Sequence, residues 1–112
     1  MSTFGELKKG DKLFMYDESL DCSYEGYVIE VIDDAIFYDG WKNFVIGLYK
    51  DDDYVSTISC EQDAKSCING STLREYVVFR EYDAMVYYIL NNLKNKMVDI
   101  DKKISKWAKH IT

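Results

Sequence analysis

The chain has 112 residues, of which 47% are hydrophobic and 15% aromatic, and its formal net charge is −6 at pH 7. This length suits one domain, and the apolar content excludes an intrinsically disordered chain. The absence of an apolar run of about 18 residues excludes a conventional transmembrane helix. The first nine residues lack the apolar centre of a secretory signal. We therefore expect a cytoplasmic protein, or a virion component if the chain is phage-encoded.

The charges are unevenly placed along the chain. Residues 1–80 hold 8 Lys and Arg against 16 Asp and Glu, whereas residues 81–112 hold 6 Lys against 4 Asp and Glu. The first segment thus carries −8 and the second +2. An acidic body repels phosphate, so we expect no binding of duplex nucleic acid. Three cysteines without paired spacing, Cys22, Cys60 and Cys67, are typical of free thiols in a reducing compartment.

Short strands separated by turns are predicted from residue 12 onward. Residues 12–17 form the first strand, and Gly26 opens a second, β-branched strand over residues 27–32. The polar stretch 18–25 has no periodicity, which predicts a long loop. Asp33-Asp34 predicts a turn into a strand over residues 35–38, and Asp39-Gly40 is a hairpin signal before a strand over residues 41–49.

The rest of the body contains two ambiguous segments. Asp51-Asp52-Asp53 predicts a polar turn before a strand over residues 54–58. Ser59 and Gln62 have capping-box spacing, so a short helical turn is one alternative for residues 60–67. Asn69-Gly70 indicates another turn. The Tyr-Val-Val-Phe run favours a last strand over residues 73–79, although Thr72 and Glu75 also form a capping box that would start the helix there.

The apolar period changes at about residue 82. From there, apolar residues are spaced alternately four and three apart without Pro or Gly between them, which predicts one long amphipathic helix with a heptad seam. We expect residues 1–80 to form the body and residues 81–112 the helix, whose start belongs to the same domain. The seam comprises Val86, Leu90, Leu93, Met97, Ile100, Ile104, Trp107 and Ile111.

These elements predict an α+β fold, a small antiparallel β-barrel followed by one long C-terminal amphipathic helix. The segments Leu-Lys-Lys-Gly-Asp-Lys-Leu-Phe, residues 7–14, and Gly-Tyr-Val-Ile-Glu-Val, residues 26–31, resemble the opening strands of SH3-like barrels. That resemblance implies an SH3-like body. Such barrels serve in peptide binding, nucleic-acid binding and virion assembly, so the fold leaves the function open.

The sequence contains no recognisable catalytic or metal-binding motif. The single histidine, His110, lies near the C-terminus, where a catalytic base would be poorly held. A calcium loop starting at Asp51 would need Gly and Glu where Ser56 and Gln62 stand. We expect no enzymatic activity, no cofactor and no metal.

Ten tyrosines are many for a chain of this length. Several aromatic residues fall in or beside strand ends and turns, where they could line a groove for a peptide. The alternative is that most belong to the barrel core, with their hydroxyl groups reaching solvent. The candidate groove residues are Tyr16, Tyr24, Tyr38, Trp41, Tyr49 and Tyr54.

The helix is predicted to be longer than the body. A helix over residues 82–111 spans about 45 Å, and a body of 80 residues has a diameter of about 30 Å. The part before Leu93 is apolar nearly all round, so we expect the body to wrap it, whereas the later part keeps only the narrow seam. We predict that this seam packs on another polypeptide through Leu93, Met97, Ile100, Ile104 and Trp107.

Two arrangements of the helix are compatible with the sequence. In one the helix folds back along its own barrel. In the other it pairs with a second copy, and a parallel pair is mildly favoured because Lys96 at a g position meets Asp101 at an e position.

The features together favour a non-catalytic protein–protein interaction or assembly protein that oligomerises or docks through its helix. Small size, absence of Pro and richness in Lys, Asp, Tyr and Ile suggest a phage or virion accessory component. One alternative is an acidic inhibitor that imitates nucleic acid on a basic partner. A second is a nucleic-acid-binding SH3-like barrel that uses its lysine-rich helix. We expect no membrane partner.

Overall fold

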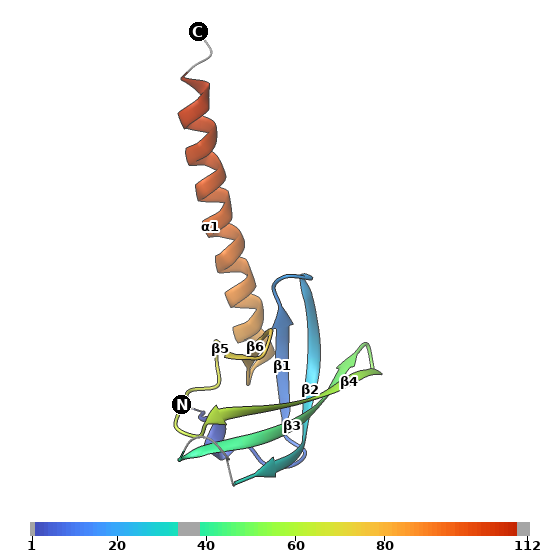
Figure 1. The fold of residues 1–112 in the computed structure, drawn as a ribbon. Coiled ribbons are helices and arrows are strands. Elements are labelled where there is room, and N and C mark those ends of the chain that lie inside the picture. The colour runs from blue at the N-terminus through green and yellow to red at the C-terminus, as the bar shows by residue number, and fades with distance from the viewer. Residues whose placement is uncertain (1, 34–38, 110–112) are drawn as a thin grey trace.

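The computed structural model describes residues 2–33 and 39–109 of the chain and shows a curled sheet with a long helix projecting from it (Figure 1). The six strands form one antiparallel sheet in the order β4-β3-β2-β1-β6-β5, curled into a half-barrel. The predicted α+β fold class is therefore confirmed. The elements are a 3-10 turn η1 (Phe4–Glu6), β1 (Lys12–Asp17), β2 (Cys22–Ile32), β3 (Trp41–Lys50), β4 (Asp53–Asp63), β5 (Ser71–Leu73), β6 (Tyr76–Phe79) and α1 (Tyr82–Ala108).

The main core fills the inner face of the curled sheet. Alternate residues in the central parts of the strands point to this face, as the pleat requires, and the residues of the core cluster are almost completely buried. The segment around η1 closes one end, where the rings of Phe4 and Phe44 lie 5.9 Å apart between centroids. The buried residues from the strands include Leu13, Met15, Val28, Ile46, Leu48 and Val78.

The strand predictions are confirmed in part. β1 occupies residues 12–17 as predicted, and the Tyr-Val-Val-Phe run forms β6. The predicted loop over residues 18–25 is wrong, because β2 begins at Cys22, which pairs with Asp17. Only a four-residue turn, 18–21, joins the two strands, with Asp21 at a φ of 51°. Polar side chains at the end of this hairpin hide the alternation that marks a strand.

Neither of the two capping-box alternatives forms a helix. β4 continues to Asp63 and pairs with β3 along its whole length, so Ser59 and Gln62 belong to a strand ladder. Thr72 lies in β5, and Arg74, at a φ of 56°, turns the chain into β6. Tertiary strand pairing overrides the local capping signal in both places. The predicted strand over residues 35–38, with Tyr38, lies outside the described residues.

A junction of two residues leads from β6 into α1. Arg80 is held there by three contacts: its backbone N–H donates to Asn69 Oδ1 at 2.7 Å, its guanidinium donates to the Lys12 carbonyl at 3.2 Å, and Asp11 pairs with it at 3.4 Å. Glu81 is the N-cap residue, and α1 begins at Tyr82 as predicted. The start of the helix therefore has a fixed direction relative to the sheet.

The first turns of α1 pack on the outer face of β1 and β6. Met85, 2% exposed, lies in a second apolar cluster with Tyr16, Val77 and Phe79. The ring of Tyr88 lies 5.3 Å from that of Phe79. This small cluster is what attaches the helix to the sheet.

Replacing Met85 with Ala should lower the free energy of unfolding by about 2–4 kcal/mol, because it leaves a cavity between the helix and the sheet. Val98, an exposed aliphatic residue of the same helix, provides the control, since Val98→Ala touches no core. Urea denaturation followed by circular dichroism measures both variants at one protein concentration. Equal stability of the two variants would contradict the anchoring role of Met85.

Candidate interaction surface: the exposed face of the long helix

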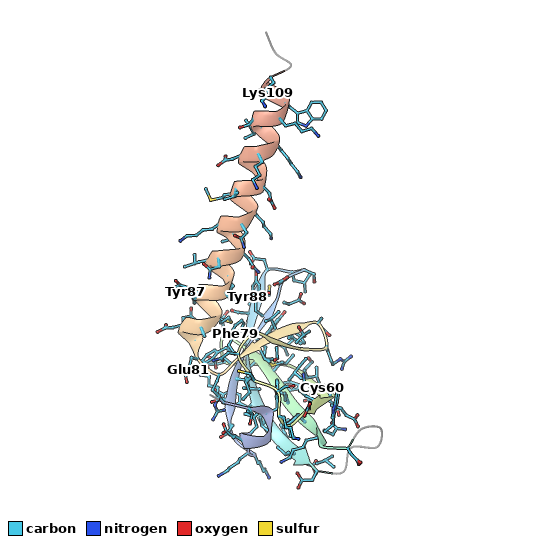
Figure 2. All side chains as sticks on the ribbon, turned by 90° about the vertical axis from the view of Figure 1, so that its left-hand side faces the viewer. Cys60, Phe79, Glu81, Tyr87, Tyr88 and Lys109 are labelled. Atoms are coloured by element: carbon cyan, nitrogen blue, oxygen red, sulfur yellow. The ribbon has the colours of Figure 1, made fainter. Side chains whose placement is uncertain are left out.

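Most of α1 extends beyond the body. The molecule measures 65 × 33 × 23 Å along its principal axes, and a helix of 27 residues is about 40 Å long. In the described residues, every side chain from Leu93 to Lys109 is exposed. Figure 2 shows this part of the helix standing clear of the sheet, with side chains directed outward on all sides. The helix does not fold back along its own half-barrel.

The body contacts α1 on one side. That side includes Met85 and Tyr88, and it ends near Asn92, whose Nδ2 donates to Glu18 Oε1 at 3.2 Å. Tyr88 also donates its hydroxyl hydrogen to Glu18. Figure 2 shows Tyr88 on the side of Phe79, with Tyr87 directed away. At 3.6 residues per turn, the centre of the heptad seam lies about 120° around the helix from this contact side.

The expectation that the body wraps the helix before Leu93 is therefore wrong. Tyr87 and Leu90 are exposed although they lie in the first turns of α1. The physical reason is that the outer face of two strands can cover only one side of a helix. As a result, the body leaves the seam uncovered even beside the sheet.

The exposed seam is continuous over about 25 Å from Leu90 to Trp107. Its side chains are between 49% and 64% exposed, and no polar residue interrupts the spacing. Surface apolar patches of this extent mark interaction sites. The structure therefore exposes on one stripe the five residues predicted to pack on another polypeptide, together with Leu90, which precedes them in the predicted seam: Leu90, Leu93, Met97, Ile100, Ile104 and Trp107.

Lysines flank the seam toward the C-terminal end of the helix. Six Lys and two Asp lie between residues 94 and 109. Near the end of α1, the Lys106 ammonium lies 5.4 Å from the centroid of the Trp107 ring. This half of α1 is thus both apolar along one stripe and basic around it.

The turn between β1 and β2 presents the opposite charge beside the first half of the helix. The buried Asp17 accepts hydrogen bonds from the Ser19 backbone and hydroxyl groups at 3.0 and 2.7 Å. The Tyr16 hydroxyl donates to Asp21 Oδ1 at 2.6 Å, and this bond, together with burial, raises the pKa of Tyr16 to about 12. Leu20, at the tip, is 65% exposed. The turn is therefore ordered and acidic, and it lies beside α1.

The predicted aromatic groove is assembled only in part. Tyr49 lies between Tyr27 and Tyr54 on the outer face, at centroid distances of 5.5 and 5.7 Å. Tyr24 also lines, with Tyr49, a depression of about 230 Å³ between the β3–β4 turn and the base of α1.

Two other predicted groove residues lie elsewhere. Tyr16 is buried under the helix, and Trp41 lies at the far end of β3, opposite Asp63. Sequence reasoning missed Phe14 and Tyr27, which belong to the same outer face, and Tyr82 of α1, whose ring lies 5.5 Å from that of Phe14. For the two strand residues, alternation with the core residues Leu13, Met15 and Val28 was the available signal.

The described residues contain no group of three or more His, Cys, Asp or Glu side chains placed to hold a metal ion. Burial raises the pKa of the Cys60 thiol to about 11, so this sulfur stays protonated at neutral pH. His110 and Ile111 lie outside the described residues. In the part of the chain that the structure covers, no helix is long and apolar enough to cross a membrane.

Comparison with protein family models, with curated proteins and with solved structures finds no significant match for this chain.

The pKa of Tyr16 predicts an alkaline loss of stability. Because the fold raises this pKa above the usual 10, the stabilisation is complete below pH 10 and is lost as the pH rises through about 12. The free energy of unfolding of the wild type should fall more steeply between pH 10 and 12 than that of Tyr16→Phe. Denaturation at a series of pH values measures this difference, and parallel curves for the two proteins would contradict it.

Proposed function

We propose that this chain is a non-catalytic assembly protein that self-associates through the seam of α1. The observation that carries the proposal is the uncovered seam, which runs along the helix on a side that the body does not use. A heptad stripe of this kind is suited to pairing with another helix, because each apolar side chain fits between four residues of the facing helix.

The stability of the helix supports a partner on this seam. The side chains of the 16 residues from Leu93 to Ala108 are all exposed. An isolated helix of this length is marginal in water, since most helical stability in proteins comes from packing of an apolar face. Association with a second helix would bury that face and stabilise the projecting half.

A second copy of the chain is the partner that this seam fits best. In such a pair each side offers the same apolar stripe, and the flanks supply both charges through Lys94, Lys96, Asp101 and Lys103. We also propose that the half-barrel is related to SH3-like barrels, on the basis of residues 7–14 and 26–31. The half-barrel would then be the body that the assembled helices display.

The ion pairs of the body bear on the acidic-inhibitor alternative. Four of its cations lie next to carboxylates, whereas a nucleic-acid mimic needs an uninterrupted array of negative charge. This mixture favours the assembly role over the inhibitor. The pairs are Lys12–Glu25, Lys42–Asp33, Arg74–Glu75 and Arg80–Asp11.

Replacing Ile100 and Ile104 with Asp should convert the assembly to monomers, because two charges would be buried in the seam without partners. The β-rich body should stay folded, since neither side chain contacts it. Light scattering coupled to size-exclusion chromatography measures the mass, and near-ultraviolet circular dichroism reports on the body.

The matched control is the double variant Val98→Asp with Ser105→Asp. Both residues lie on the side of the same exposed helix stretch away from the seam, and Val98 is 51% exposed against 54% for Ile100. The control adds the same charge and should keep the mass of the wild type. A wild type that is already monomeric at high concentration, or a seam variant that keeps an oligomeric mass, would overturn the proposed function.

A further inference from the structure

The two halves of α1 lie in opposite electrostatic surroundings. The first half lies beside the acidic turn 18–21, which touches the helix through Glu18. The second half carries six Lys against two Asp between residues 94 and 109. A single chain cannot bring these regions together, because the helix holds them apart. Two chains can do so, if their helices run in opposite directions.

The body lies beside one flank of the seam. With Leu90 at an a position, Ile89 and Lys96 fall at g positions, and Met85 and Asn92 at the neighbouring c positions. Ile89 packs against the cluster that attaches the helix to the sheet, and Asn92 reaches Glu18. The acidic turn is therefore adjacent to the g flank. Any flank of a second helix that packs beside this g flank therefore also approaches the acidic turn.

The seams of two copies are complementary when their helices run antiparallel. In antiparallel helix pairs each a residue packs in a layer with a d residue of the other chain, and g flanks face g flanks. Three layers then form twice by symmetry: Leu90 with Trp107, Leu93 with Ile104, and Met97 with Ile100. Every exposed seam residue of the described chain has a partner in this register.

This register also determines where the lysines of the second helix lie relative to the acidic turn. Ile104 packs at the level of Leu93, so Lys106 of the second copy falls at the level of Asn91 and Asn92, on the flank that faces the turn. We propose that two copies pair antiparallel along α1, so that the lysine-bearing end of each helix lies against the acidic turn 18–21 of the other chain. This inference rests on the proposed function and adds the direction and the second contact surface.

The pairs along the seam alone do not decide the direction. A parallel dimer gains Lys96 with Asp101, whereas an antiparallel dimer gains Lys94 with Asp101 and sets Lys96 near Lys103. Each exposed pair contributes little. The net charges of the bodies and of the helix tips favour the antiparallel direction. A parallel dimer sets two bodies of −8 side by side at one end and two lysine-rich tips at the other.

Disulfide trapping with Leu93→Cys and Ile104→Cys tests the direction. A disulfide needs Cα atoms about 4.4–6.8 Å apart. In the antiparallel dimer residue 93 faces residue 104, and two copies of residue 93 are about 16 Å apart along the axis. We expect a mixture of the two single variants, one with a size tag, to form a cross-linked heterodimer under mild oxidation. Each variant alone should cross-link no more than the wild type, which controls for the native cysteines.

The outcomes separate the inference from the function on which it rests. Cross-linking of each single variant with itself, in a protein of dimeric mass, would mean a parallel pair and would overturn the inference alone. A dimeric mass with no cross-linking above the wild type in any sample would place the interface elsewhere and overturn both. A monomeric mass would also overturn both.

Charge reversal tests the contact with the turn. Lys106→Glu should raise the dissociation constant of the dimer roughly threefold to tenfold at low salt, and the difference should disappear at about 1 M salt. Lys65→Glu makes the same charge change on an exposed residue of the body next to β4, and it should have little effect. Sedimentation equilibrium measures both. Equal effects of the two substitutions would contradict a local contact between the helix tip and the turn.

Discussion

The direction of α1 is set at the junction between β6 and the helix, and most properties of the molecule depend on it. Only Arg80 and Glu81 separate the two elements, and Arg80 bonds to Asn69, Lys12 and Asp11. A longer or looser connection would let the amphipathic helix lie down on the sheet and bury its seam. The short junction instead directs the helix away from the half-barrel, and the cluster around Met85 holds it there.

The outer face of the sheet attaches the helix by a side that does not include the seam. Met85 and Tyr88 contact β1 and β6, and the β1–β2 turn adds Glu18 as an acceptor for Tyr88 and Asn92. The residues that anchor the helix are therefore different from the seam residues through which we propose that it associates. Under that proposal, substitutions in the seam abolish assembly without unfolding the body, whereas substitutions at Met85 act on stability.

The sequence predicts where the regular elements lie better than it predicts how they pair and pack. β1 is a short apolar run that follows a Gly-Asp turn, and α1 has an apolar repeat of seven residues, so the limits of β1 and the start of α1 could be predicted. The start of β2 at Cys22 and the extension of β4 to Asp63 depend on pairing with neighbouring strands, which leaves no local mark among polar residues. The heptad stripe identifies the seam, but which side of the helix meets the body depends on tertiary contacts such as those of Met85, Tyr88 and Asn92.

The same limit explains why direction could not be derived from the sequence. Viewed as an isolated helix, the chain offers only the flanking charges Lys94, Lys96, Asp101 and Lys103, whose parallel and antiparallel pairings differ by little. Once the body is placed beside the g flank, the comparison includes the acidic turn and the net charge of each body as well. Like charge then accumulates at both ends of a parallel pair and is separated in an antiparallel one, so the position of the sheet on the helix is what favours the antiparallel pair that we propose.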